Sequence, residues 1–205
     1  MTIPGGYGAS SILVPGMWLH PDELTSHALV DYERGGIALN DTSEGLLYQD
    51  WTLWLRGDDV VIKAENYAPN PPTVLFTFTG ITELSLAFDQ NMNPFVAYVR
   101  DGEPWFWWWD PSPNDYVHVA LPVDCLTPRC CMDDKRDNAA GYGFSDVILA
   151  YARNDNIYTR EQRNRYIDED LFEANVFARL IKIGMHGGNR LQLLLTDPDT
   201  EEVCP

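Results

Sequence analysis

The sequence predicts an all-β protein built from repeated β-hairpins. Short apolar runs with an alternating pattern recur along the chain, and clusters of Gly, Pro, Asn and Asp separate them. A turn motif that begins with arginine recurs in three places. Only residues 168–179 combine apolar residues at helical spacing with acids at the front and arginine at the rear, so we expect at most one short helix, near this segment. The hairpins are expected to form either a sandwich or a partial, open propeller-like domain.

The chain of 205 residues is expected to hold one β-rich domain, residues 27–195, between two flanking segments. Residues 1–26 are rich in Gly, Pro and Ser and predict an extended N-terminal arm. Such an arm either becomes ordered on a neighbouring subunit or stays a loosely tethered terminus. Residues 196–205 predict an acidic C-terminal tail.

Composition narrows the classes of function. Apolar residues make up 45% of the chain, which is enough for a core, and no run approaches the roughly 20 apolar residues of a membrane span. The N-terminus lacks the basic region of a signal peptide, so we expect a cytosolic product. A net charge of −17 argues against direct nucleic-acid binding. The acidic composition is expected to keep the protein soluble. Alternatively, it would suit the wall of a conduit for nucleic acid, because negative charge repels nucleic acid.

The first part of the domain predicts five strands. A turn at residues 34–36 separates the first two, and Gly57 with its neighbouring acids closes a hairpin between the next two. Residues 67–72 contain three prolines and are expected to be irregular. The predicted strands are residues 27–33, 36–41, 46–55, 60–63 and 73–79.

Residues 82–110 predict three further strands joined by two tight turns. Leu84, Leu86 and Phe88 alternate with small residues, which is the period of a strand. Turn clusters follow at residues 89–94 and 100–104. The third strand, residues 105–109, is a run of five aromatic side chains.

The remaining chain predicts one more strand, a long loop and two hairpins. Residues 116–121 alternate as a strand, and residues 122–146 are expected to be a single irregular loop. Loops of that length are usually functional or packed on a partner. The two hairpins pair residues 147–152 with 157–161, and 178–185 with 190–195.

The arginine turn motif indicates an internal repeat. Arg56, Arg100 and Arg153 each follow an apolar strand and precede a polar turn and a second strand, at intervals of 44 and 53 residues. Such spacing is typical of propeller blades, although hairpin turns also resemble one another by chance. The arginines are expected to bond turn carboxylates such as Asp58 and Asp101, with an anion-binding cluster as the alternative.

No catalytic, metal or cofactor motif is found. Serine-nucleophile, zinc-protease, P-loop and dinucleotide-binding patterns are missing, as is the Asp box of sialidase blades. The 31 acids would supply a glycosidase-like pair by chance, so their abundance indicates nothing. We therefore predict no enzyme activity, no catalytic residues, no metal and no cofactor. The scattered histidines, for which core or surface roles are expected, are His20, His27, His118 and His186.

The four cysteines do not form a recognised framework. Cys125, Cys130 and Cys131 lack the paired spacing of a structural zinc site and have no histidine nearby. Reduced thiols are expected in a cytosolic product, with a zinc site or a disulfide to Cys204 as alternatives.

The aromatic run is the candidate interaction site. Trp105, Trp107 and Trp109 share one face of their strand, while Phe106 and Trp108 share the other. With aromatics on both faces, we expect a core on one side and an inter-sheet or subunit interface on the other. The alternative is an aromatic row that stacks on the sugar rings of a host-surface glycan.

Two segments resemble repeats in tail-associated virion proteins of tailed bacteriophages. They are LSLAFDQNMNPFVAYVRDGEPWFWWWD at residues 84–110 and DVILAYARNDNIYTREQRNRY at residues 146–166. The hairpin LIKIGMHGGNRLQLLL, residues 180–195, is similar to a closing hairpin of such proteins. The resemblance covers about residues 80–195, and Met92 stands where the family pattern has glycine.

The resemblance implies propeller-like hairpin repeats and a structural role. It implies a multi-copy component of the phage tail or head–tail junction, assembled in the host cytoplasm and located in the virion. The expected partners are further copies of the chain and other phage virion proteins. A carbohydrate-binding or sialidase-like receptor-recognition module of the tail, and an unrelated cytosolic β domain, remain alternatives.

Overall fold

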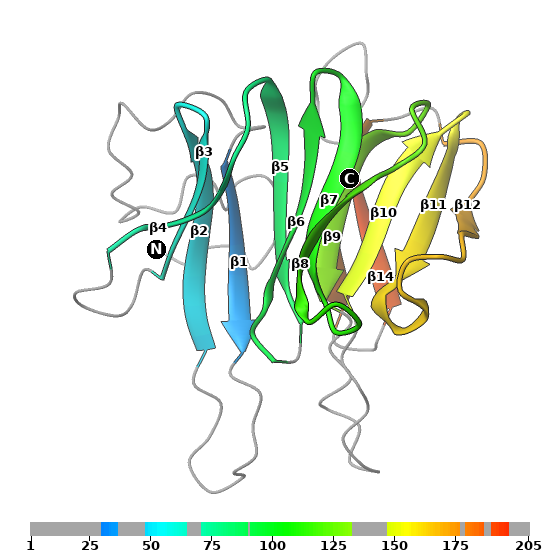
Figure 1. Ribbon diagram of the computed structural model, residues 1–205. Coiled ribbons are helices and arrows are strands. Elements are labelled where there is room, and N and C mark those ends of the chain that lie inside the picture. The colour runs from blue at the N-terminus through cyan, green and yellow to red at the C-terminus, as the bar shows by residue number, and fades with distance from the viewer. Residues whose placement is uncertain are drawn as a thin grey trace, which may run out of the picture.

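The computed structural model describes residues 30–36, 48–64, 71–89, 91–132, 147–176, 179–186 and 190–196. Most of them lie in β-strands, which confirms the all-β prediction (Figure 1). A single short 3₁₀ helix, η4 (Gln162–Asn164), interrupts the strands of these segments. The strands are β1 (Val30–Gly36), β2 (Tyr48–Arg56), β3 (Asp59–Ala64), β4 (Thr73–Thr77), β5 (Ile81–Phe88), β6 (Pro94–Arg100), β7 (Glu103–Asp110), β8 (Asp115–Ala120), β9 (Leu126–Met132), β10 (Val147–Arg153), β11 (Asn156–Glu161), β12 (Asp170–Glu173), β13 (Arg179–His186) and β14 (Arg190–Thr196).

The strands form a series of antiparallel sheets in chain order. Sheet A contains β1 to β4, sheet B β5 to β8, sheet C β9 to β12, and sheet D β13 and β14. Neighbouring strands in each sheet are neighbours in sequence, so every sheet is a meander of hairpins. The first strands of successive sheets lie beside one another, because β5 contacts both β1 and β9 and β9 contacts β13. Sheets A to C therefore fan out as in Figure 1, which is an open, propeller-like arrangement.

The structure confirms the arginine repeat. Arg56, Arg100 and Arg153 are the last residues of β2, β6 and β10, the second strands of sheets A, B and C. Each pairs across a two-residue turn with the first residue of the next strand. The recurring motif thus marks the same turn in three sheets.

The helix candidate at residues 168–179 forms no helix in its described residues, 168–176 and 179, which agrees with the expectation of at most one short helix. Residues 170–173 form β12, in which Asp170 pairs with Thr159 and Leu171 with Tyr158 of β11. Beyond β12, the Val176 amide donates to the Asp155 carbonyl oxygen at 2.6 Å. These bonds to the β10–β11 hairpin supply backbone partners that a local helix would otherwise provide, so tertiary pairing overrides the helical pattern.

The prediction of one irregular loop at residues 122–146 is wrong for residues 126–132, which form β9. This strand contains Pro128, and Thr127 has a positive φ of 47°. The pairing register of β9 with β10 shifts between Ala150 and Ala152. An irregularity of this kind tolerates a proline, which explains why the sequence pattern does not reveal the strand.

Two other local predictions have clear outcomes. The turn expected at residues 34–36 is wrong, because these residues continue β1 and pair with β2. In the turn after β5, Met92 has a positive φ of 64°. The backbone of this turn thus has a conformation that favours glycine, although the residue is methionine. The predicted arm at 1–26, residues 133–146 of the predicted loop and most of the acidic tail lie outside the described residues.

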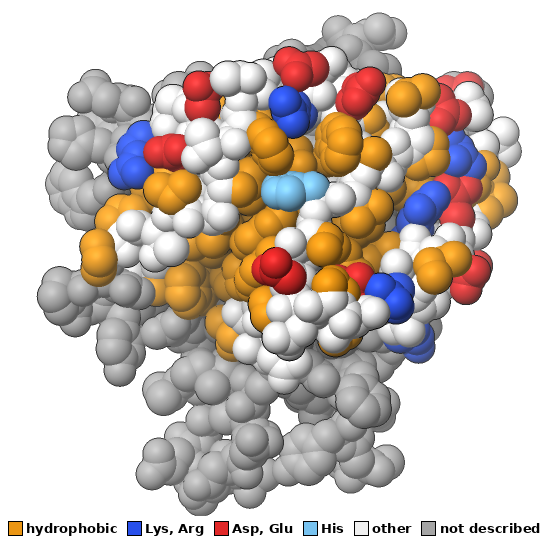
Figure 2. Space-filling view, in the orientation of Figure 1, with side chains coloured by type: hydrophobic (Ala, Val, Ile, Leu, Met, Phe, Trp, Pro, Cys, Tyr) orange, Lys and Arg blue, Asp and Glu red, His pale blue; other side chains and the backbone are white. Residues whose placement is uncertain are grey.

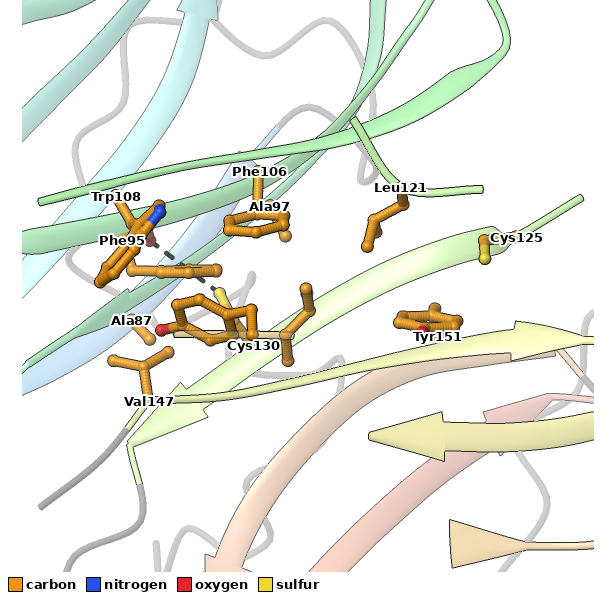
Figure 3. Packing of buried hydrophobic residues seen from close by; sticks show 12 residues of the cluster. Ala87, Phe95, Ala97, Phe106, Trp108, Leu121, Cys125, Cys130, Val147 and Tyr151 are labelled. Atoms are coloured by element: carbon orange, nitrogen blue, oxygen red, sulfur yellow. Dashed lines mark hydrogen bonds between the residues drawn. The ribbon is translucent and has the colours of Figure 1, made fainter. Parts of the chain in front are cut away.

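Three buried layers hold the sheets together. One layer lies between sheets A and B, one between B and C, and one between C and D. Figure 3 shows the layer between B and C, where Phe95, Phe106 and Trp108 of sheet B face Cys130 and Val147 of sheet C. Its buried members are Ala87, Phe95, Ala97, Phe106, Trp108, Leu121, Cys125, Cys130, Val147, Leu149, Tyr151 and Tyr166.

Candidate interaction surface

The aromatic run of β7 lies between two neighbouring sheets of the same chain. Trp107 is buried in the layer toward sheet A, and Trp105 packs against that layer. Phe106 and Trp108 are buried in the layer toward sheet C. Trp105 and Trp109 are half-buried. The prediction that Trp105 and Trp107 face one way and Phe106 and Trp108 the other is therefore confirmed. Sheets A and C of this chain cover the two faces of β7.

An aromatic surface continues from β7 onto the outer strands of sheets A and B. The Tyr116 ring stacks on Trp107 with centroids 4.0 Å apart, and Trp109 meets Tyr116 edge-on at 5.1 Å. Phe76 of β4 contacts Trp107 from the side of sheet A, with centroids 5.2 Å apart. Figure 2 shows hydrophobic side chains gathered, with a histidine among them, on the face that carries β4 and β8.

His118 is the polar group of this aromatic surface. Its Nδ1 lies 2.9 Å from the hydroxyl of the buried Tyr98, and Phe76 and Phe78 contact its ring. Desolvation lowers the pKa of His118 below its ordinary value, and the charge of Arg100 lowers it further. His118 is therefore neutral at physiological pH and serves as a packing and hydrogen-bonding residue.

The three repeat arginines make different contacts. Arg56 lies 3.7 Å from Asp59, where Asp58 was the expected partner. Arg100 pairs with Asp101 at 3.5 Å, as expected, and its guanidinium lies 4.3 Å from the centroid of the Phe78 ring. These residues do not form one anion-binding cluster, because each arginine lies in its own sheet with an acidic partner.

Arg153 belongs to a denser polar network in sheet C. Glu169 accepts bonds from Tyr151, Arg153 and Arg160, and the distance from Arg153 Nη1 is 3.0 Å. Arg160 Nε also donates to the Tyr151 hydroxyl at 2.8 Å. Arg153 also lies 3.8 Å from Asp124. Through Arg153, the segment before β9, which contains Asp124, is connected to the segment before β12, which contains Glu169.

The network shifts the pKa of its members. Desolvation alone would raise the pKa of Glu169, but the hydrogen bonds from Tyr151 and Arg153 and the charge of Arg153 outweigh it, so the net shift is downward. For Tyr151, burial and the bond to Glu169 raise the pKa. Glu169 is thus held as the anion that neutralises two arginines.

We expect the Glu169→Gln variant to unfold more easily at neutral pH by about 2 kcal/mol, because two largely buried arginines lose their anion. The wild type gains stability from this carboxylate above its ordinary pKa of 4.5 and loses it as the pH falls through the lowered folded value. The Glu169→Gln variant should not lose this part of its stability as the pH falls. Urea unfolding across the acidic range measures both effects.

Glu173→Gln is the matched control, because Glu173 is an exposed acid on the same sheet. It should leave the pH profile unchanged. Identical profiles for the wild type and Glu169→Gln below the ordinary pKa would contradict the role of the Glu169 network.

Exposed apolar side chains lie adjacent or close in sequence to the acids Asp124 and Glu169 of this network. Val123 is 76% exposed beside Asp124, and Ile167 and Leu171, on either side of Glu169, are 73% and 57% exposed. Phe172, next to Leu171 on β12, is 40% exposed. We call Val123, Ile167, Leu171 and Phe172 the outer surface of sheet C.

This surface is unlike the equivalent parts of sheets A and B. Apolar residues of the outer strands β4 and β8, such as Phe76 and Val117, pack against the buried layers. In β12 all four residues are exposed. On the sheet D side, the described residues provide only β13 and β14. The outer strand of sheet C therefore exposes Leu171 and Phe172, whereas β4 exposes only Val74 among its large apolar side chains. The sequence pattern alone does not reveal this difference.

The segment that contains η4 and the residues after it contacts sheet B. Arg165 pairs with Asp110 at the end of β7, with an Nη2–Oδ2 distance of 2.5 Å. Tyr166 inserts its ring against Phe106 and Trp108, with centroids 4.9 Å and 5.0 Å away. The segment that follows η4 thus fixes sheet C to sheet B.

The cysteines and acidic residues show no metal site in the described part of the chain. Cys125, Cys130 and Cys131 are buried, and burial raises the pKa of Cys125 to about 11. Cys204 lies outside the described residues. No group of three potential ligands is found in those residues, and no helix among them is long and apolar enough to cross a membrane.

No protein-family model matches the chain, and no curated protein matches it. Among solved structures, the chain is similar to the crystal structure of TolB from Acinetobacter baumannii, with 13% sequence identity and a TM-score of 0.41. The match covers 76% of this chain and 39% of the TolB chain, so this chain spans about two fifths of that structure. Similarity at this level carries no implication for function.

Proposed function

We propose that this protein is a structural component of a tailed-phage virion, present in several copies in the tail or at the head–tail junction. It acts through protein–protein contacts with other copies and with other virion proteins, and it carries out no catalysis. The observation that carries the proposal is the exposed outer surface of sheet C. The resemblance of residues 84–110 and 146–166 to tail-associated proteins supports the same role.

The physical reasoning concerns the free energy of exposed apolar area. Large apolar side chains that group on a surface mark sites of protein contact, because their burial against a partner is favourable. Leu171 and Phe172 are exposed on a strand, and the hydrogen bonds of Glu169 hold the adjoining segment in place. A surface that is ordered before binding loses less conformational entropy on assembly.

The second candidate is glycan recognition through the β7 aromatics. The half-buried Trp105 and Trp109, with Tyr116, are the rings that retain exposed area for a sugar. The other three aromatics of β7 lie inside the protein, which favours assembly over stacking. Glycan-array binding that Trp109→Ala abolishes, with folding intact, would support the second candidate.

The assembly proposal is tested by analysing particles from a phage that carries this gene. Mass spectrometry of purified virions should detect the chain in several copies per particle. The Leu171→Ser/Phe172→Ser variant should enter particles much less well, while Val74→Ser, at an exposed position of β4, should enter normally. Absence of the chain from purified virions would overturn the proposal.

A further inference from the structure

The charge around the outer surface of sheet C indicates which kind of partner it takes. Asp168, Asp170 and Glu173 are exposed beside Leu171 and Phe172. In sequence, the exposed apolar residues Leu171 and Phe172 of this short strand are therefore flanked by exposed carboxylates on both sides. A partner that covers this strand must accommodate the negative charge as well as the apolar area.

The nearby arginines do not neutralise these acids. Arg153 and Arg160 bond Glu169, Arg163 pairs with Glu161 at 2.6 Å, and Arg165 pairs with Asp110. Every arginine between residues 153 and 165 thus has another acidic partner. The chain as a whole also carries a net charge of −17, so distant charge adds to the local field.

We propose that the outer surface of sheet C binds a basic segment of another protein, one that carries both apolar and arginine or lysine side chains. This inference rests on the assembly function proposed above and names the chemistry of its partner. The apolar side chains of the segment cover Leu171 and Phe172. Its cations lie beside Asp170 and Glu173, where the mainly exposed setting makes the attraction depend on salt.

The contacts that hold the surface in place add to the argument. Glu169, between Asp168 and Asp170, accepts bonds from Tyr151 and two arginines. Strand β12, which carries Leu171 and Phe172, is held by its backbone pairing with β11. The acids and apolar residues therefore have fixed spacing before a partner arrives, which favours recognition of a segment with a matching pattern.

The test measures binding of short fluorescein-labelled peptides to the full chain by fluorescence anisotropy. The probe alternates arginine and leucine, and two reference peptides replace arginine by glutamate or leucine by serine. The arginine–leucine peptide should bind most tightly and should weaken as salt is added. Equal binding of the glutamate–leucine peptide would overturn the proposed charge preference.

Paired variants locate the binding. Leu171→Ser/Phe172→Ser should weaken binding by about tenfold or more, and Asp170→Asn/Glu173→Gln by about threefold. The matched controls Val74→Ser and Asp58→Asn/Glu103→Gln remove similar groups from sheets A and B and should leave binding unchanged. Circular dichroism confirms that each variant is folded. Equal weakening by variants and controls would overturn the location.

The two proposals fail in different ways. If virions contain the chain but the arginine–leucine peptide does not bind, the basic partner is wrong while the virion role stands. If the peptide binds at sheet C but virions lack the chain, the virion role is wrong while the docking chemistry stands.

Discussion

Replacement of Tyr166 by alanine is expected to lower the free energy of unfolding by about 3–5 kcal/mol, the usual cost of deleting a large buried aromatic side chain. Tyr166 is 2% exposed and contacts Phe95, Phe106 and Trp108 of sheet B, although it belongs to sheet C. The truncation would leave a cavity in the layer between the two sheets. Urea unfolding followed by tryptophan fluorescence measures the loss.

Two variants make this prediction specific. Tyr166→Phe keeps the ring and should retain most of the stability. Ile167→Ala removes the next side chain along the chain, which is 73% exposed, and should change stability by less than about 0.5 kcal/mol. A loss for Tyr166→Ala no larger than that for Ile167→Ala would show that the ring does not hold sheets B and C together.

The second large effect is expected at Glu83, which links three first strands. Glu83 of β5 lies 2.8 Å from Arg129 of β9 and 3.0 Å from Arg179 of β13. Arg129 is 7% exposed, so removal of the carboxylate would leave a buried guanidinium without this ion pair. We expect Glu83→Ala to lower the free energy of unfolding by about 3 kcal/mol.

The two arginines should differ in their response. Arg179 has an exposed side chain, and Arg179→Ala should cost less than about 1 kcal/mol. Arg129→Ala should cost clearly more, because it removes both the ion pair and buried packing. Glu103→Ala, at an exposed acid of sheet B, is the control for the loss of a carboxylate. Equal effects of Glu83→Ala and Glu103→Ala on urea unfolding would refute the linking role.

The two predictions together describe how the open fan of sheets is held. Apolar layers provide most of the burial between sheets, and the Tyr166 ring extends the layer between B and C. The Glu83 ion pairs connect the first strands of B, C and D, where the sheets come closest. Loss of either contact should therefore loosen the packing of whole sheets and lower the cooperativity of unfolding.

Much of the candidate surface was beyond sequence reasoning. The aromatic run at residues 105–109 was visible because five rings in succession need cover on both faces. The outer surface of sheet C could not be predicted from the sequence, because Leu171 and Phe172 lie in a segment with the pattern of an amphipathic helix. Their exposure depends on which strands cover β12, and that is a property of sheets distant in sequence.

The sequence by itself determined the all-β class, most strands and the arginine repeat, because alternation and turn chemistry act between near neighbours. It also determined that Trp107 and Phe106 face opposite ways, since strand geometry alone sets the faces. Only the tertiary structure decided that residues 126–132 and 170–173 are strands, because their partners in β10 and β11 override the local pattern. It also decided that sheets of this chain cover both faces of β7 and leave β12 exposed, because burial depends on sheet packing.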